Sequence, residues 1–189
     1  MNKAAQATGH SLLALMEADS ARFRQQAAEC PADLGLWTKL YTVSQIMLSA
    51  MQQSRVSSAL EEICSNLLGC EQLAIIDISR RTGRIQFLKS QQLSSEKLMA
   101  VAEQGPVLES QIQRGTLQVI SDKRDEESGK FSQLGITALV PLWLDDESSG
   151  CLLLFSLLPQ RSGYDIEDRE VLRLLATHAG PCLRSEKRG

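Results

Sequence analysis

The chain has 189 residues, of which 43% are hydrophobic and 23% are charged, and its formal net charge is -3. This composition is typical of a globular domain with one main core, and the slight acidic excess excludes a broad basic surface for nucleic acid. No window reaches the roughly 18 apolar residues of a membrane span, and acidic residues interrupt the first apolar stretch. We therefore expect a cytoplasmic protein that neither binds nucleic acid nor inserts into a membrane.

The five cysteines have a spacing that fits neither a zinc site nor a disulfide framework. None belongs to a CxxC pair, and the shortest interval runs from Cys64 to Cys70. We expect reduced thiols that pack as small apolar side chains, and we expect no metal and no cofactor. The cysteines are Cys30, Cys64, Cys70, Cys151 and Cys182.

Helical patterns fill the first third of the chain. Residues 11–29 are loosely amphipathic and end before Pro31, so they predict a weak helix that needs a partner surface. Apolar residues at spacings of three and four predict a strong helix over residues 37–51. A second stripe predicts a helix over residues 56–67, which Gly69 caps.

The hydrophobic period changes to that of β-strands at residue 72. Two β-rich runs, at residues 72–79 and 84–90, flank a turn with Gly83 and predict an antiparallel hairpin. Two short helical pieces then follow, at residues 96–103 and 106–114.

A short strand follows Gly115, and residues 121–134 form a charged loop of the length that usually carries function.

A second hairpin is the clearest β pattern in the sequence. Two apolar β-runs at residues 136–144 and 151–158 then flank an acidic, serine- and glycine-containing turn. Both runs are expected to be buried on two faces and central in the sheet.

The last element is a helix over residues 165–179. Asp165 is the expected N-cap, and acidic residues in the first turn favour the helix dipole. Gly180 and Pro181 are expected to end or kink this helix. A lone histidine on this helix, His178, is expected to be an interface or hydrogen-bonded residue without a catalytic role.

Three stretches resemble, in order, local features of the GAF domain, a small-ligand sensing relative of the PAS fold. These are VLESQIQRGTLQVISD, ALVPLWLDDESSGCLLLFS and YDIEDREVLRLLATHAG. The resemblance covers about residues 38–183. It implies an α+β fold with a central antiparallel sheet, the first and last helices packed on one face, and connecting helices and loops over the other face.

The domain division follows from this resemblance and from the break near residue 35. Residues 1–35 are expected to be an N-terminal helical extension and linker. Residues 36–184 are expected to be the GAF domain, and residues 185–189 a flexible tail.

The resemblance does not imply one ligand, because the fold hosts many. The motif of the cyclic-nucleotide binders is absent, since Lys123 follows Asp122 rather than Asn and no Asp-Glu pair follows Phe131 at the required distance. The only histidines are His10 and His178, neither of which is expected near the pocket, and this argues against a tetrapyrrole.

An enzymatic function is one hypothesis that the resemblance raises, because one GAF branch reduces free methionine sulfoxide with a cysteine nucleophile. Cys151 is the only cysteine on a predicted strand, and the glycine- and cysteine-rich motif of that branch is missing. We therefore expect no catalytic residue.

A ligand, if one binds, is expected over the sheet between the helix of residues 106–114 and the loop of residues 121–134. That loop combines polar side chains with an apolar one that could close as a lid. The candidate ligand-binding residues are Ile85, Phe87, Ile112, Asp122, Lys123, Arg124 and Phe131.

A homodimer is expected through the helices of residues 37–51 and 165–179. The apolar stripe of the first helix is longer than one sheet face needs, and small residues on the second permit close approach. The candidate interface residues are Leu40, Val43, Met47, Ala50, Leu172, Ala176 and Ala179.

The first functional hypothesis is a stand-alone GAF regulatory module in bacterial-type cytoplasmic signalling. It would bind a small molecule or a partner protein and act through dimer geometry or through docking by the N-terminal helix. The alternative is a structural interaction protein whose degenerate pocket is filled by side chains. A concave pocket with a few convergent polar groups would distinguish the two hypotheses.

Overall fold

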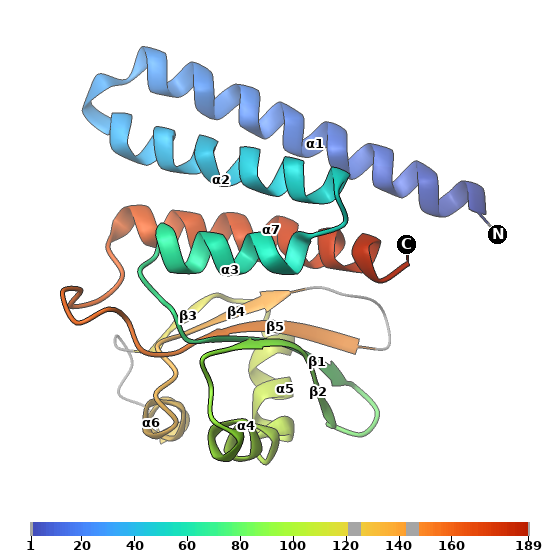
Figure 1. Ribbon diagram of the computed structural model, residues 1–189, viewed down its shortest axis with the longest axis vertical. Helices are drawn as coiled ribbons and strands as arrows, with labels where there is room; N and C mark the ends of the chain where they lie inside the picture. The colour runs from blue at the N-terminus through green and yellow to red at the C-terminus, as the bar shows by residue number, and fades with distance from the viewer. Residues whose placement is uncertain (1, 121–125, 143–147, 189) are drawn as a thin grey trace.

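The computed structural model describes residues 2–120, 126–142 and 148–188, with side chains given for 11–30, 32–120, 129–142 and 149–184. A central sheet has helices on both faces (Figure 1). On one face α3 and α7 pack against the sheet, with α2 and then α1 stacked outside them, while α4, α5 and α6 lie over the opposite face. The helices are α1 (Asn2–Glu29), the 3-10 helix η1 (Pro31–Asp33), α2 (Leu34–Gln52), α3 (Val56–Asn66), α4 (Ser95–Ala102), α5 (Gly105–Gln113), α6 (Glu126–Gln133) and α7 (Ile166–Arg188).

The strands of the described residues form one antiparallel, five-stranded sheet in the order β2-β1-β5-β4-β3. This arrangement confirms the α+β class and both predicted hairpins. The most central strand, β5, pairs with β1 on one side and with β4 on the other. The strands are β1 (Leu73–Ser79), β2 (Ile85–Gln91), β3 (Gln118–Val119), β4 (Ala138–Leu142) and β5 (Ser148–Leu154).

The two faces of the sheet carry two separate apolar cores, because successive side chains of a strand point to opposite faces. On β5, Leu152 and Leu154 face α3 and α7, whereas Cys151 and Leu153 face α4 and α5. All four side chains are fully buried. The strand is therefore buried on both faces, as its continuous apolar run predicted.

The N-terminal helix has the partner surface that its weak pattern required. Phe23 is buried and stacks on Trp37 of α2, with 6.1 Å between the ring centroids. His178 of α7 lies 3.0 Å from Asp19 of α1 through its Nε2 atom, so it is a hydrogen-bonded residue between helices, as predicted. None of the helices within the described ranges is both long enough and apolar enough to cross a membrane.

The prediction that Gly180 and Pro181 end or kink the last helix was wrong about its end. The helix α7 continues to Arg188, so the helical part includes residues that we expected to form a flexible tail. An internal proline removes one backbone hydrogen bond and costs about 3 kcal/mol. Burial of Cys182 and Leu183 beyond the proline offsets this cost, with the Cys182 sulfur 3.6 Å from the sulfur of Met16 on α1.

The expected charged loop contains a helix. Residues 126–133 form α6, and its Phe131 side chain is only 1% exposed. One apolar anchor is sufficient here, because the helix packs onto a preformed apolar surface. The short strand expected after Gly115 has two paired residues, Gln118 and Val119.

Candidate functional site

The face of the sheet under α4, α5 and α6 is the place where a ligand was expected. Apolar side chains from the sheet and from these helices meet there and exclude water. Phe131 of α6 and Phe155, which directly follows β5, are the largest of them, and both are buried. The other buried members are Ala74, Ile76, Ile78, Val101, Leu108, Ile112, Ile120, Ile136, Leu139, Cys151 and Leu153.

This layer is built from short helices, each positioned by local features. Ser94 caps α4 by accepting a hydrogen bond from the backbone N–H of Lys97 at 3.2 Å. At the start of α5, a Cβ on Gly105 would lie 2.2 Å from the carbonyl oxygen of Gly83. Glycine is therefore required where α5 meets the β1–β2 turn, and this contact sets the position of α5 over the sheet.

The four described ligand candidates lie in this layer. Ile112 and Phe131 are buried within it, and Ile85 and Phe87 are partly buried against it from β2. The structure thus brings these residues onto one face of the sheet. The other three candidates, Asp122, Lys123 and Arg124, lie outside the described residues.

A buried amide pair stands at the β3 end of the apolar layer. The Nε2 atom of Gln118 on β3 donates to Oε1 of Gln111 on α5 at 2.5 Å. Both side chains are buried, and Arg114 also donates to Gln111 Oε1 at 3.3 Å. A polar side chain inside an apolar layer costs free energy unless it is hydrogen-bonded, so this pair fixes α5 against β3. An amide can donate and accept, and in this pair each glutamine serves as the partner of the other within the apolar layer.

Sequence reasoning missed both glutamines, because Gln normally lies on the surface. One signal was present: Gln118 precedes Val119 on a strand, so the two side chains must point to opposite faces. Since Val119 belongs to the core beside α7, Gln118 must face α5.

A lysine lies beside the same layer, close to Phe155. The Lys97 ammonium is 4.6 Å from the centroid of the Phe155 ring, and it donates to Oε1 of Gln72 at 3.3 Å. Desolvation lowers the pKa of Lys97 below its ordinary value, and Cys70 opposes this shift. The contact between cation and ring ties α4 to the end of the sheet.

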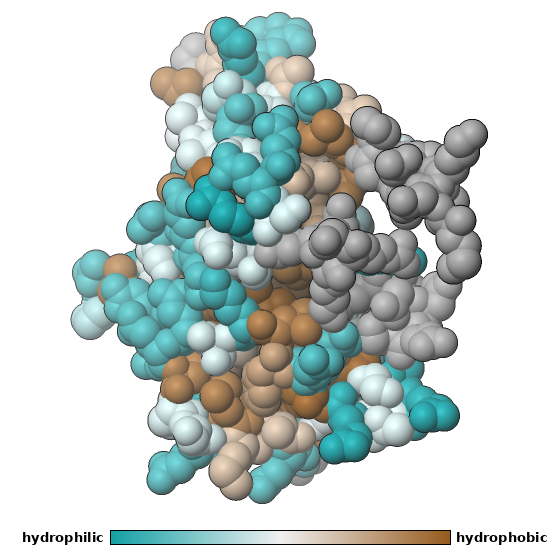
Figure 2. Space-filling view, turned by 45° about the vertical axis from the view of Figure 1, so that its right-hand side comes forward, coloured by the Kyte–Doolittle hydropathy of each residue, from teal (hydrophilic) through white to brown (hydrophobic). Residues whose placement is uncertain are grey.

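Figure 2 shows hydrophobic surface gathered at the level of the sheet and of α4 and α5, below the mostly hydrophilic helical part. Partly buried Ile85, Phe87 and Val107 belong to this layer, and Met99 of α4 is 66% exposed. The layer formed by α4, α5 and α6 therefore has apolar side chains at its surface.

The buried cysteines lack the properties of a nucleophile. Burial raises the pKa of Cys64, of Cys70 and of Cys151, and it raises the pKa of Cys182 to about 12. A reactive thiol needs a lowered pKa and an accessible sulfur. Within the part of the chain that the structure describes, no cluster of His, Cys, Asp or Glu could hold a metal ion.

The residues proposed for the dimer interface lie inside the chain. The α2 side chains pack against α1 and α7, because α1 covers the outer side of α2 (Figure 1). These side chains therefore serve the intramolecular core, which corrects the interface that we expected from the sequence. Buried in this way are Leu40, Val43, Met47, Ala50, Leu172 and Ala179, and Ala176 is partly buried.

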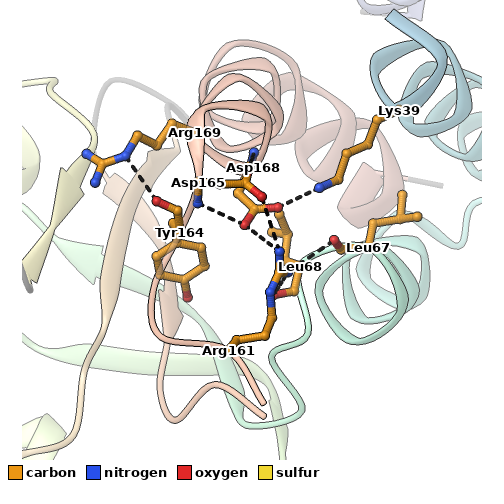
Figure 3. A network of polar contacts seen from close by, with 8 residues as sticks. All are labelled: Lys39, Leu67, Leu68, Arg161, Tyr164, Asp165, Asp168 and Arg169. Atoms are coloured by element: carbon orange, nitrogen blue, oxygen red, sulfur yellow. Dashed lines mark hydrogen bonds and ion pairs between the residues drawn. The ribbon is translucent and has the colours of Figure 1, made fainter. Parts of the chain in front are cut away.

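A buried ion network joins the elements on the α2, α3 and α7 side of the sheet, which we call the helical side (Figure 3). Asp168 of α7 is fully buried, and its carboxylate lies 2.5 Å from the Lys39 ammonium of α2 and 2.8 Å from Nη2 of Arg161. Arg161 also donates to the carbonyl oxygen of Leu68 at 2.6 Å, beyond the end of α3. One carboxylate thus joins α2, α7, the segment after α3 and the segment before α7.

The start of α7 completes this network. Asp165 accepts a hydrogen bond from the backbone N–H of Asp168 at 2.8 Å, which confirms Asp165 as the N-cap. Before it, the Tyr164 hydroxyl lies 2.9 Å from the Thr137 hydroxyl. No local pattern in the sequence indicated the cluster of Lys39, Arg161 and Asp168, because Lys39 lies 129 residues before Asp168.

The comparisons with known proteins concern the fold. No protein-family model matches the chain, and no curated protein matches it. The ligand-binding domain of VqsR from Pseudomonas aeruginosa is similar, with a TM-score of 0.55 and 15% identity, over 78% of this chain and 96% of that chain. A GAF domain from Pseudomonas syringae pv. tomato has a TM-score of 0.46 and 19% identity, over 87% of this chain and 94% of that chain.

The VqsR domain has a similar fold at low sequence identity. In the structure, the antiparallel sheet carries the first and last helices of the predicted domain on one side and the connecting helices on the other. These are the layers that the resemblance implied. The chain therefore has a GAF-like fold.

Proposed function

We propose that the chain is a regulatory sensing module that binds a small molecule between the sheet and the α4–α6 layer. The observation that carries the proposal is the buried amide pair of Gln111 and Gln118 at one end of an otherwise apolar layer. Binding sites for small molecules combine apolar walls with a few polar groups that orient the ligand. The similar VqsR structure is described as a ligand-binding domain, which agrees with this proposal.

The chemistry of the site defines the class of ligand. The apolar side chains favour an aliphatic or aromatic body, and the amide pair favours one group that both accepts and donates a hydrogen bond. A ligand of this kind would replace the hydrogen bond between Gln118 and Gln111, so that neither amide loses its partner. It would enter by displacing the short helices α5 and α6, and their new positions would be the signal.

The sensing module is proposed to be non-enzymatic and to act in cytoplasmic signalling by changing protein contacts. The raised pKa values of the buried thiols support a role without a cysteine nucleophile. A thiol that stays protonated at neutral pH cannot perform the chemistry that the methionine sulfoxide hypothesis needs.

A protein with a permanently filled layer is the second candidate. Phe131 and Phe155 favour it, because their buried rings already occupy the space above the sheet. In that case the module would act as an interaction domain, and the amide pair would only fix α5 against β3.

Native mass spectrometry of the gently purified protein, followed by thermal shift with octanol, octanamide and octanoate, tests the proposal. We expect a bound small molecule, or a higher melting temperature with at least one of these probes. The variant Gln118→Leu should lose that shift. The matched control Gln113→Leu removes an exposed glutamine of α5 and should keep it.

If the wild-type protein carries no molecule and no probe shifts its melting temperature, the filled interaction domain is the better explanation. A shift that survives in Gln118→Leu would mean that the amide pair does not contact the ligand.

A further inference from the structure

The outer face of α1 has no covering element in the described part of the chain. The opposite face packs on α2 and α7 through Met16, Ser20 and Phe23, which are buried. Figure 1 shows α1 as the outermost layer on the helical side, at the greatest distance from α4–α6. From residue 11 onward, one side of this long helix is thus exposed.

The exposed side has the spacing of a coiled-coil seam. Its residues follow one another at alternating intervals of three and four, which places them at the a and d positions of a heptad. The same spacing continues in the sequence to Ala7 and Ala4. The exposed residues of this outer face are Ser11, Ala14, Ala18, Ala21, Gln25 and Ala28.

Charged residues flank the outer face in a complementary order. Glu17 and Arg24 precede the a positions, and Arg22 and Glu29 follow the d positions; all four are exposed. In a parallel, in-register pair of helices, each g residue faces the e residue five positions later in the partner. Glu17 then faces the partner's Arg22, and Arg24 faces the partner's Glu29.

The antiparallel alternative uses these charges less completely. In a pair centred between Ala18 and Ala21, Glu17 meets the partner's Arg24, while Arg22 and Glu29 face no opposite charge. Leu15, which is 59% exposed beside the outer face, gains cover in either arrangement. Charge complementarity therefore favours the parallel pair.

We propose that the outer face of α1 binds the same face of a second copy of this chain, as a parallel two-helix coiled coil. This interface replaces the one expected through α2 and α7, whose apolar faces are covered within the chain. Because the proposed interface is on the side of the molecule away from α4–α6, it leaves the proposed ligand site of each copy accessible. The proposal does not depend on ligand binding.

Sedimentation equilibrium of the full chain tests the pairing. We expect a reversible dimer over micromolar to several hundred micromolar protein, because small side chains bury little apolar area. Ala18→Glu places two like charges at the seam and should raise the dissociation constant at least about tenfold. The control Ala102→Glu changes an exposed alanine of α4 and should leave the constant unchanged.

Charge reversal tests the partner arrangement. Arg22→Glu should weaken the dimer by about tenfold, and adding Glu17→Arg to it should restore most of the affinity. Arg22 also lies 5.2 Å from the centroid of the buried Phe23 ring and 3.7 Å from Asp19, so Arg22→Glu should lower the melting temperature of the monomer slightly. The double variant keeps that loss, so a restored affinity reports on the pairing alone.

Cross-linking tests the direction of the helices. In a Cys30→Ser background, Ala14→Cys and Ala28→Cys should each cross-link to the same residue of the partner with a short bismaleimide. An antiparallel pair cannot bring both positions to their own copies, so a cross-link at only one of them would overturn the parallel arrangement. A wild-type chain that stays monomeric at several hundred micromolar, or an Ala18→Glu variant that dimerises as the wild type does, would overturn the interface.

Discussion

The two helical sides of the sheet are held in different ways. On one side α2, α3 and α7 have 19, 11 and 23 residues, and the buried carboxylate of Asp168 joins them through Lys39 and Arg161. On the other side α4, α5 and α6 have 8, 9 and 8 residues. These short helices pack through apolar contacts, the amide pair and the contacts of Lys97 with Gln72 and Phe155.

This difference separates stability from response. Long helices in a continuous core open only when the domain unfolds, whereas short helices with exposed apolar edges can open locally at lower free energy. Sensing needs an element with two accessible arrangements. In the function that we propose, the α4–α6 layer takes that role, and the α2, α3 and α7 side gives it a fixed support.

Removing the central carboxylate should have a large effect on stability. Asp168→Asn removes the buried anion that Lys39 and Arg161 share, and Arg161 keeps only the longer pair with Asp165 at 3.6 Å. The free energy of unfolding should fall by about 3 kcal/mol, the low end for a buried pair, because both cations are partly exposed. Urea denaturation measures the change. The control Glu170→Gln breaks the exposed pair with Arg173 and should cost less than about 1 kcal/mol. Equal effects of both variants would show that the network does not fasten the helical side.

Truncating a buried side chain to alanine should affect the free energy of unfolding differently on the two sides of the sheet. Leu172→Ala, in the core beside α2 and α3, should lower the free energy of global unfolding by about 2–5 kcal/mol. Phe131→Ala removes a larger side chain from α6, and its cost should be at or below the low end of that range, because α6 can detach without the rest. Circular dichroism with denaturant gives both values. A larger loss for Phe131→Ala would place α6 in the cooperative core.

Alkaline pH should destabilise the domain. Burial raises the pKa of Cys182 to about 12 and raises that of Cys151 and Tyr164 as well, so the folded protein keeps protons that the unfolded chain loses above about pH 9. The stability is fully present below that pH and falls by up to about 1.4 kcal/mol per pH unit for each group as the pH rises toward 12. Denaturation at a series of pH values measures the slope. Cys182→Ala should make it shallower, and an unchanged slope would contradict this assignment.

Two glycines of the α4–α6 layer should respond in opposite directions. Gly105→Ala forces a Cβ into the carbonyl of Gly83 and should cost about 1–3 kcal/mol. A Cβ on Gly129 of α6 would meet no atom of the described residues within 4 Å outside its own helix, so Gly129→Ala should stabilise that helix by up to about 1 kcal/mol. Melting temperatures measure both changes. If Gly105→Ala were neutral, the close contact between α5 and the β1–β2 turn would not position the layer.

Much of the sheet and of the helical side could be predicted from the sequence, because periodicity reports which faces are buried. The stripe of α2 and the apolar run of β5 each predicted a real element. The same rule failed where tertiary packing outweighs local preference. Pro181 should interrupt a helix, yet buried Cys182 and Leu183 keep α7 helical. In α6, buried Phe131 anchors a charged sequence.

The face of the sheet that carries four of the candidate residues was predictable, while ligand binding by these residues stays a prediction. Ile85, Phe87, Ile112 and Phe131 lie on the expected face, because strand alternation and the order of elements determine that face. The apolar face of α2 was wrongly assigned to a dimer interface, because such a face has the same sequence pattern whether its partner is α1 or a second chain. Strand alternation could indicate the face of Gln118 but not its partner, and the contact of Lys39 with Asp168 depends on tertiary geometry that no local pattern encodes.

Native-state amide hydrogen exchange tests the central claim most directly, because it reports the opening free energy of each segment. We predict that amides of α4, α5 and α6 exchange through local opening, well below the global free energy of unfolding. Amides of β5 and of α7 up to Pro181 should exchange only with global unfolding. If both sides of the sheet exchanged at the same free energy, the α4–α6 layer would not be a separate responsive element, and the central claim would be contradicted.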